Sequence, residues 1–299
     1  MDKDKWIGGL AEWHDADTTY LSVAFTWKLD EAYARAVFAR ALGKRVIAGG
    51  PALFLVKMQH ELSDVAEIGK EYPDALFHHN RSATIASRGC PVGCWFCIVP
   101  AMEGREFTLL PDFPVRPILC DNNLSALPAD YQDHIISRYR ATGTKLLDAN
   151  SGFEPITFTP DVYARWRDLL NEGGGPWRFA YDETKERDQV FAVMKMLEDE
   201  PQKRKRCYVL VGNEPYADCM NRIQEVIDWG CEPHVQPYIK LNALHREPHV
   251  RFDWTLQKLK DVARWANGFV WKRAPFSEYD RHRRNVSPET YDEQQGLFT

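Results

Sequence analysis

From residue 81 onward, short runs of apolar and β-branched residues alternate with helical patterns. Six of these runs are predicted strands, at 83–88, 116–121, 144–150, 177–182, 207–212 and 233–238. Helices are predicted at about 129–141, 160–171, 184–198, 216–229 and 254–266. Strands that alternate with helices pair in parallel through right-handed crossovers. The chain is therefore predicted to be an α/β protein, either one barrel with an appendage or two modest domains.

The residues before and after this region follow different patterns. The first 80 residues predict one βαβ unit and a further helix, with strands at 18–27 and 44–50 and helices at 29–42 and about 60–70. This is about half of a doubly wound, Rossmann-like domain. The last 31 residues are rich in arginine and aromatic side chains and are expected to pack as a C-terminal arm. The predicted domains are 1–80, 81–268 and 269–299.

The composition argues against several classes of protein. With 44% hydrophobic residues, the 299-residue chain can build a core, so disorder is expected only at the ends. The net charge of −5 shows no basic excess, and the basic run at 203–206 is predicted to be a solvated loop, so a nucleic-acid partner is not indicated. The chain has no apolar run of ~18 residues and no signal-peptide pattern, so we expect a soluble, cytoplasmic protein without a membrane partner.

Three of the seven cysteines lie in the stretch "RGCPVGCWFC". Cys90, Cys94 and Cys97 have the spacing C-x3-C-x2-C, and an odd number of cysteines without an export signal argues against a disulfide framework. Three thiolates in one loop point to a soft metal centre. Structural zinc normally takes four ligands, and Cys120 could be the fourth only if its strand end approaches the loop. Three ligands on a four-iron cluster would instead leave one iron open for catalysis.

The stretch "ASRGCPVGCWFC", which follows a predicted strand, resembles the signature of radical S-adenosylmethionine (radical SAM) enzymes. The resemblance covers about residues 81–268 and implies a partial (β/α)6 TIM-like barrel. It implies that Cys90, Cys94 and Cys97 hold a [4Fe-4S] cluster whose open iron binds S-adenosyl-L-methionine. Reductive cleavage of that cofactor would give a 5′-deoxyadenosyl radical for C–H activation of a substrate. A flavodoxin or ferredoxin would donate the electron.

The resemblance also implies positions for cofactor and substrate at the carboxyl ends of the strands. The residues implied to bind the cofactor are Phe96, Asp121, Asn122, Asn123, Asn150, Asp182, Val211, Gly212 and Asn213. The residues implied to line the substrate side are Tyr181, Gln236, Tyr238 and Lys240. The Gly-Gly-Glu that family members carry after the second strand is replaced here by Asp121, Asn122 and Asn123. Catalytic residues beyond these are not identified.

Residues 19–58 resemble the later half of a cobalamin-binding domain. The lower-ligand motif Asp-x-His-x-x-Gly is missing, so we expect a truncated relic and no bound cobalamin. Sulfur insertion is disfavoured because no cysteine precedes Cys90. The alternatives are a non-catalytic iron–sulfur electron carrier, a zinc-stabilised binding module and, as a minor one, a cobalamin-dependent radical SAM methyltransferase. Substrate and net reaction are not determined by the sequence.

Overall fold

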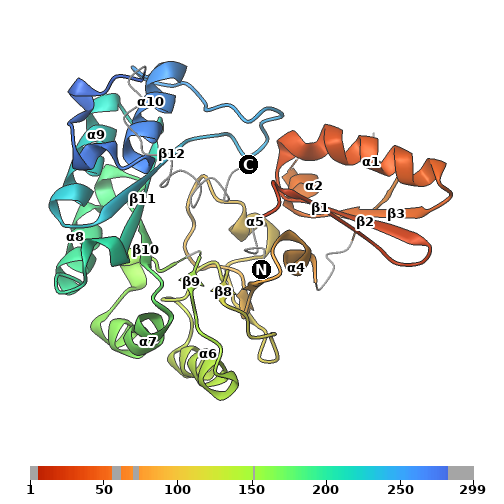
Figure 1. Ribbon diagram of the computed structural model, residues 1–299, viewed down its shortest axis with the longest axis horizontal. Helices are drawn as coiled ribbons and strands as arrows, with labels where there is room; N and C mark the ends of the chain where they lie inside the picture. The colour runs from red at the N-terminus through yellow and green to blue at the C-terminus, as the bar shows by residue number, and fades with distance from the viewer. Residues whose placement is uncertain (1–5, 56–61, 70–73, 151, 282–299) are drawn as a thin grey trace.

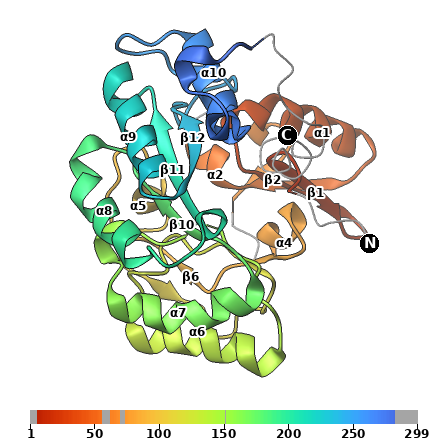
Figure 2. The ribbon, with the colours of Figure 1, turned by 60° about the vertical axis from the view of Figure 1, so that its left-hand side comes forward.

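Two groups of strands and helices lie side by side in the protein. The computed structural model describes residues 6–55, 62–69, 74–150 and 152–281 (Figure 1). The N-terminal strands and helix α1 form one group, and helices α6 to α10 surround the strands of the other (Figures 1 and 2). Each group has its own hydrophobic core, one formed by residues between Leu10 and Ala66 and the other by residues between Ala86 and Val270. The domain boundaries themselves stay a prediction.

The N-terminal group is built on a four-stranded sheet. Its strands are β1 (Leu10–His14), β2 (Thr18–Val23), β3 (Arg45–Gly49) and β4 (Glu67–Ile68), in the order β1-β2-β3-β4. Strands β2, β3 and β4 run parallel, and β1 is antiparallel to β2. The predicted βαβ unit is therefore present, with α1 (Leu29–Ala41) between β2 and β3. The prediction of a helix at about 60–70 is wrong for residues 67–68, which form strand β4 and pair with β3. Residues 60, 61 and 70 lie outside the described part of the chain.

Helix α1 covers this sheet through small side chains. Ala32, Ala36 and Ala39 recur at helical spacing, are at most 3% exposed, and pack in the same core as Leu21 and Val46. Alanine allows the helix backbone to approach the sheet closely. The short helices η1 (Thr26–Lys28), α2 (Pro51–Leu55) and α4 (Ala75–His79) complete this part of the chain.

All six strand positions predicted after residue 81 contain strands. These are β5 (Ala83–Thr84) with β6 (Ser87–Arg88), β8 (Ile118–Leu119), β9 (Asp148–Ala149), β10 (Trp177–Ala180), β11 (Lys205–Val211) and β12 (Glu232–Pro237). They form two parallel three-stranded sheets, β5-β8-β9 and β10-β11-β12. The first predicted strand is interrupted, because β6 leaves the parallel sheet and pairs antiparallel with β7 (Thr108–Leu109). The fold is thus α/β with mixed sheets.

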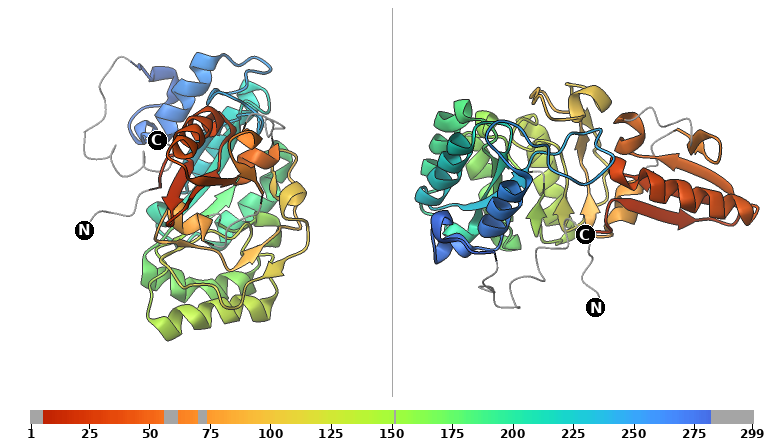
Figure 3. Two further views of the ribbon diagram at one scale, coloured as in Figure 1. Left: turned by 90° about the vertical axis from the view of Figure 1, so that its right-hand side faces the viewer. Right: turned by 90° about the horizontal axis from the view of Figure 1, so that it is seen from above.

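We propose that the two parallel sheets are halves of one partial barrel. The Phe153 amide donates to the Arg178 carbonyl at 2.9 Å, and Arg178 Nε donates to Asp148 Oδ1 at 2.6 Å. These contacts join the end of β9 to β10, where the two sheets meet. Seen from above, the helices lie outside the strands, away from the N-terminal group (Figure 3). This arrangement is the one expected for strands that curve around a shared interior.

The helices lie close to their predicted ranges. They are α5 (Val99–Met102), α6 (Ala129–Thr142), α7 (Pro160–Gly173), α8 (Arg187–Met196), α9 (Tyr216–Asp228) and α10 (Leu256–Asn267), with short turns η2 (Pro155–Thr157), η3 (Thr184–Glu186) and η4 (Gln202–Arg204). Thr159 caps α7, as its position before Pro160 indicates, because its side chain accepts a hydrogen bond from the Val162 amide at 3.3 Å. The C-terminal turns η5 (Val270–Lys272) and η6 (Phe276–Glu278) follow, and the Phe276 ring lies 5.6 Å from Trp265.

Within the part of the chain that the structure describes, no helix combines the length and apolar character needed to cross a lipid bilayer.

Candidate cofactor site

The three clustered cysteines lie in the loop between β6 and α5. The Cys90 amide donates to the Gly104 carbonyl at 3.3 Å, and the Cys97 amide donates to the Cys94 carbonyl at 3.1 Å. All three thiols are free and half-buried. The Val99 amide lies 3.4 Å from Cys97 Sγ and donates to it. The loop therefore carries three thiols that form no disulfide, and backbone hydrogen bonds fix its conformation.

One carboxylate, Glu103, holds the start of this loop. Its Oε2 accepts hydrogen bonds from the Gly89 amide at 2.9 Å and from Asn122 Nδ2 at 2.7 Å, and its Oε1 accepts one from Arg88 Nη1 at 2.9 Å. Gly89 has a φ of +89°, and an added Cβ would overlap the carbonyl oxygen of Glu106. Only glycine fits this position, so the turn before Cys90 is fixed by sequence.

The three thiols influence one another electrostatically. Burial, with the charge of Glu154 and the neighbouring thiols, raises the pKa of Cys94 to about 12. Burial also raises the pKa of Cys97. Such sulfurs become thiolates when a bound cation compensates their charge.

The donor set fits an iron–sulfur cluster better than a single ion. Among the described residues, no group of three or more His, Cys, Asp or Glu side chains is placed to hold one metal ion. A compact zinc site would need such a group. A four-iron cluster spreads its ligands over separate iron atoms, and thiolates are the ligands it takes. Three half-buried thiols from one loop suit that group.

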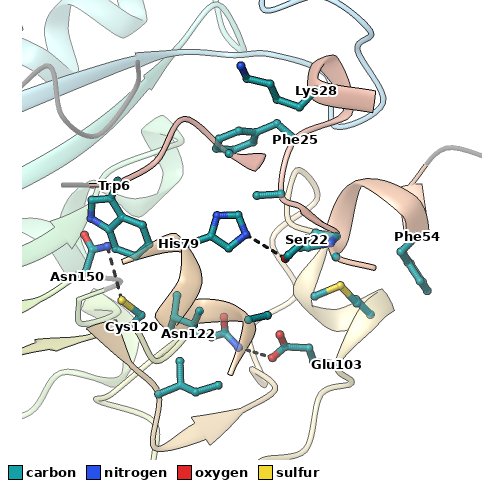
Figure 4. Close-up of a pocket in the computed structure, with 18 of the residues that line it drawn as sticks. Trp6, Ser22, Phe25, Lys28, Phe54, His79, Glu103, Cys120, Asn122 and Asn150 are labelled. Carbon is teal, nitrogen blue, oxygen red and sulfur yellow. Dashed lines mark hydrogen bonds between the residues drawn. The ribbon is translucent and has the colours of Figure 1, made fainter. Parts of the chain in front are cut away.

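A cavity of about 1170 Å³ lies between the two groups of strands. One side is formed by the carboxyl ends of strands from the two three-stranded sheets, and the other by residues of the N-terminal group, which include Trp6, Ser22 and Phe25 (Figure 4). Arg88 and Phe96 from the cysteine loop line the cavity, whereas the three cysteines are not among its lining residues. The cysteine loop therefore forms part of the wall of a space large enough for organic ligands.

Five of the predicted cofactor and substrate residues line this cavity together: Phe96, Asn122, Asn150, Asp182 and Gln236. Asn150 Nδ2 lies 3.9 Å from Cys120 Sγ (Figure 4). Burial, together with the charge of Glu186, raises the pKa of Asp182 to about 7. The strand ends thus supply amide groups and a titratable carboxylate to one space. Their contact with a cofactor stays a prediction.

Asp121 and Asn123 are placed differently from Asn122. The Asp121 side chain is fully buried, and it accepts hydrogen bonds from Ser87 Oγ and from the Ala86 amide, the latter at 2.9 Å. Burial raises the pKa of Asp121 to about 6. Asn123 is 2% exposed and its Nδ2 lies 3.9 Å from Cys90 Sγ. Both side chains lie beside the cysteine loop and neither lines the cavity, so the predicted cofactor contact of these two residues stays a prediction.

Val211, Gly212 and Asn213 follow β11 but also lie outside the cavity lining. The Val211 carbonyl accepts a hydrogen bond from the Tyr238 amide at 2.8 Å. Gly212 has a φ of +87°, and an added Cβ would lie 3.0 Å from Leu259. Asn213 Nδ2 donates to the Asp182 carbonyl at 2.6 Å. In this structure these residues position neighbouring strand ends, and the cavity wall at this strand is formed by Tyr208 and Leu210 instead.

Three predicted substrate residues do not line the cavity. Tyr181 is fully buried, and its hydroxyl donates to Glu225 of α9 at 2.9 Å, so it points away from the cavity. Successive side chains of a strand alternate between faces, so Tyr181 cannot share a face with Asp182. The Tyr238 ring packs against Trp95 of the cysteine loop at 5.2 Å. Lys240 is exposed in the loop after β12.

Several residues that line the cavity are not among the cofactor and substrate residues predicted from the sequence. Glu154 is one of them, and burial with the nearby charge of Glu186 raises its pKa to about 7. Cys120 and Glu103 are two others. Glu154 follows the third predicted strand, so its position after a strand end indicates that it could line a site at the carboxyl ends of the strands. The residues of the N-terminal group gave no such signal, because only tertiary packing brings them here.

No protein-family model matches the chain. It is similar to tRNA-2-methylthio-N(6)-dimethylallyladenosine synthases over 128 residues, which make up 36% of this chain. The identity is 30% to the synthase of Mycolicibacterium paratuberculosis, of which 25% is covered. It is 30% to that of Mycobacterium avium, of which 18% is covered, and 29% to that of Mycobacterium bovis, of which 25% is covered.

The chain thus spans a quarter or less of the length of these curated relatives. The similarity supports the radical SAM superfamily in coarse terms, and with it an enzyme.

Proposed function

We propose that this protein is a radical SAM enzyme. Cys90, Cys94 and Cys97 would hold a [4Fe-4S] cluster, and the adjoining cavity would hold S-adenosyl-L-methionine together with a substrate. With the cluster bound, an electron from a flavodoxin or ferredoxin would cleave the cofactor to methionine and a 5′-deoxyadenosyl radical, which takes a hydrogen atom from the substrate. The net reaction on the substrate is left open.

The observation that carries the proposal is the position of the cysteine loop. Three free thiols lie in one loop, directly after β6, and Phe96 beside Cys97 lines a cavity of about 1170 Å³. An electron carrier needs no such cavity next to its cluster. Structural zinc normally takes four ligands, whereas this loop offers three free thiols. These two alternatives are therefore less well supported.

The chain's own residues would orient the ligands and exclude water. The amide side chains of Asn122 and Asn150 offer donors and acceptors at the cavity wall. Asp182 and Glu154 lie where burial favours their protonated forms, so each can hold a proton near neutral pH or pair with a cationic group. Phe96 offers an aromatic face beside the last cysteine.

The proposal does not include bound cobalamin. The motif Asp-x-His-x-x-Gly is missing, and the nearby stretch "WHDAD" (residues 13–17), which has neither its spacing nor its glycine, forms the end of β1 and the turn before β2. A cobalamin-dependent methyltransferase therefore stays a minor alternative.

We also propose that the substrate is not nucleic acid, although the named relatives are tRNA-modifying synthases. Three of the four cations at 203–206 are engaged within the fold, so this part is not the expected solvated loop, and Lys203 alone of the four is exposed. Lys205 is 3% exposed and donates to the Leu197 carbonyl at 3.1 Å, Arg204 donates to Asn171 at 2.9 Å, and Arg206 lies 3.6 Å from Glu232. A phosphate backbone would need such cations free at the surface.

Anaerobic reconstitution with iron and sulfide tests the cluster assignment. The protein should take up about four irons and four sulfides per chain and turn brown. Cys94→Ala should lose most of this iron, while Cys231→Ala, a matched change at a fully buried core cysteine, should keep it. A colourless protein that binds one zinc, or full iron loading in Cys94→Ala, would contradict the proposal.

A further inference from the structure

The cavity lies at the carboxyl ends of the parallel strands of the N-terminal sheet and of the two three-stranded sheets. On the N-terminal side, the chain just after β2 lines it through Ala24 and Phe25, the end of β3 through Gly49, and the end of β4 through Ile68 and Gly69. On the other side lie the barrel strand ends described above. Open α/β sheets bind their ligands outside the carboxyl ends of their strands. The N-terminal sheet is therefore placed as half of a binding site, and it does more than pack against the barrel.

The cavity is larger than the usual range for a pocket that holds one ligand. Pockets for single drug-sized ligands have volumes of about 300–1,000 Å³. S-adenosyl-L-methionine is a molecule of that size and would occupy the barrel side. The cavity of about 1170 Å³ therefore leaves space next to the N-terminal sheet.

The N-terminal side of the cavity is lined mainly by aromatic and apolar side chains. Trp6, Phe25, Trp27 and Phe54 all line it, and Phe25 stacks on Trp27 with ring centroids 4.6 Å apart and 10° between the planes. A Cβ added at Gly9 would overlap the Phe25 ring, so the ring can pack here only because residue 9 is glycine. In the close-up view, Trp6 lies to the left of His79 and Phe25 above it (Figure 4).

Aromatic faces of this kind attract flat rings through stacked and edge-to-face contacts. Polar groups on this side are few. They are the pair formed by His79 Nε2 and Ser22 Oγ at 3.0 Å, and Lys28, whose charge is compensated because its Nζ donates to Glu31 Oε2 at 2.8 Å. Burial lowers the pKa of His79 to about 4, so its ring is neutral near pH 7 and adds no charge. The surface suits a largely uncharged, planar group.

We infer that the N-terminal half of the cavity binds the substrate, and that the substrate is a small organic molecule with a flat ring system. The assignment of this ligand as substrate rests on the proposed function; the binding half-site itself does not. The N-terminal sheet would hold the ring while the barrel holds the cofactor, so the two ligands would meet at the strand ends.

The test uses 1-anilinonaphthalene-8-sulfonate, a probe with a flat ring system whose fluorescence rises on binding. Titration of the full chain should reveal one strong site. Gly69→Phe adds a ring at the cavity wall, where a Cβ would meet no heavy atom within 4 Å, and should weaken this site about tenfold or more. Ala34→Phe, on the exposed side of α1, is the matched control and should bind like the wild type.

The exposed apolar residues of α1 are the competing site for such a probe. Phe38 is 67% exposed and does not line the cavity, so Phe38→Ser should leave the strong site unchanged. If Phe38→Ser abolishes the strong site and Gly69→Phe does not, the inference is overturned. Circular dichroism and thermal unfolding of each variant show whether it folds.

Competition on the wild-type protein tests the shape of the ligand without any mutation. Two sulfonates with ten carbons each, 1-naphthalenesulfonate and 1-decanesulfonate, compete with the probe below the micelle concentration of the latter. The planar compound should displace the probe at the lower concentration, and the opposite order would overturn the inference. These titrations need neither iron nor S-adenosyl-L-methionine. Probe binding without cofactor cleavage would therefore sink the proposed function alone, and cleavage without a strong probe site would sink this inference alone.

Discussion

Removing the Glu103 carboxylate should loosen the cysteine loop and make its cluster labile. Glu103→Ala deletes three hydrogen bonds, from the Gly89 amide, Arg88 and Asn122. Hydrogen bonds to a charged group contribute about 1.5–3 kcal/mol each. The Glu103 side chain is 11% exposed and that of Arg88 is 29% exposed, so water replaces part of what is lost. A net cost of about 3 kcal/mol is expected, which changes the equilibrium for loop ordering about 100-fold.

Iron release measures this effect without any assay of catalysis. Anaerobically reconstituted protein is mixed with an iron chelator, and the rate of iron transfer is followed by absorbance. Glu103→Ala should load less iron or release it about 100-fold faster than the wild type. Glu106→Ala, an exposed glutamate of the same loop, is the matched control and should behave like the wild type. If Glu103→Ala loads and keeps iron as the wild type does, the loop does not depend on this carboxylate and the reasoning fails.

Three further predictions concern the fold around the site. Gly89→Ala should prevent cluster loading because its Cβ would overlap the Glu106 carbonyl oxygen. Gly104→Ala, also at positive φ but with open space around the Cβ, should lower the free energy of unfolding by only about 1–2 kcal/mol. Equal iron contents of the two variants would contradict this prediction. Arg222→Met should lower the free energy of unfolding by about 3–5 kcal/mol in urea titrations. The side chain is 1% exposed, and its guanidinium donates to the backbone carbonyls of Tyr181 at 2.6 Å and Leu210 at 2.9 Å. A loss below about 1 kcal/mol would refute this prediction. Burial lowers the pKa of His79 to about 4, so the stability it contributes is present above its unfolded pKa near 6.5 and is lost as pH falls toward 4. His79→Asn should therefore flatten the loss of stability between about pH 6.5 and 4, and an unchanged pH profile would exclude His79 as the cause.

The positions of the strands after residue 81 could be predicted because apolar and β-branched runs mark them. Their lengths could not. The first predicted strand breaks between β5 and β6, at Ala86. There the Ala86 amide donates to Asp121 at 2.9 Å, and its carbonyl accepts from the Tyr131 hydroxyl at 2.6 Å. Side chains that lie far away in the sequence thus replace strand partners, and no local pattern reports this.

The cysteine loop could be located from sequence because its spacing and glycines are local features. The faces of the flanking residues could not all be assigned. Tyr181 and Asp182 are neighbours in sequence, yet one binds Glu225 of α9 and the other lines the cavity. Asp121 is turned inward by its bonds to the loop backbone. The alternation of side chains along a strand shows which residues face the cavity only when the register of the strand is known.

The N-terminal half of the cavity was missed because it depends on contacts between distant segments. Thr26, just after β2, donates through its hydroxyl to the Leu241 carbonyl at 3.3 Å, across 215 residues of sequence. A pattern read along residues 1–80 predicts a sheet and a helix, but it does not predict which edge of the sheet faces the barrel. The N-terminal unit was therefore expected only to pack on the barrel, whereas its strand ends form the cavity wall.

The central claim is that Cys90, Cys94 and Cys97 hold a cluster that cleaves S-adenosyl-L-methionine. Its most direct test is to incubate the anaerobically reconstituted protein with dithionite and S-adenosyl-L-methionine and to measure 5′-deoxyadenosine by mass spectrometry. The wild type should release 5′-deoxyadenosine and methionine in equal amounts, and Cys94→Ala should release neither. A wild type that carries the cluster and releases no 5′-deoxyadenosine, or a Cys94→Ala variant that releases as much as the wild type, would contradict the claim.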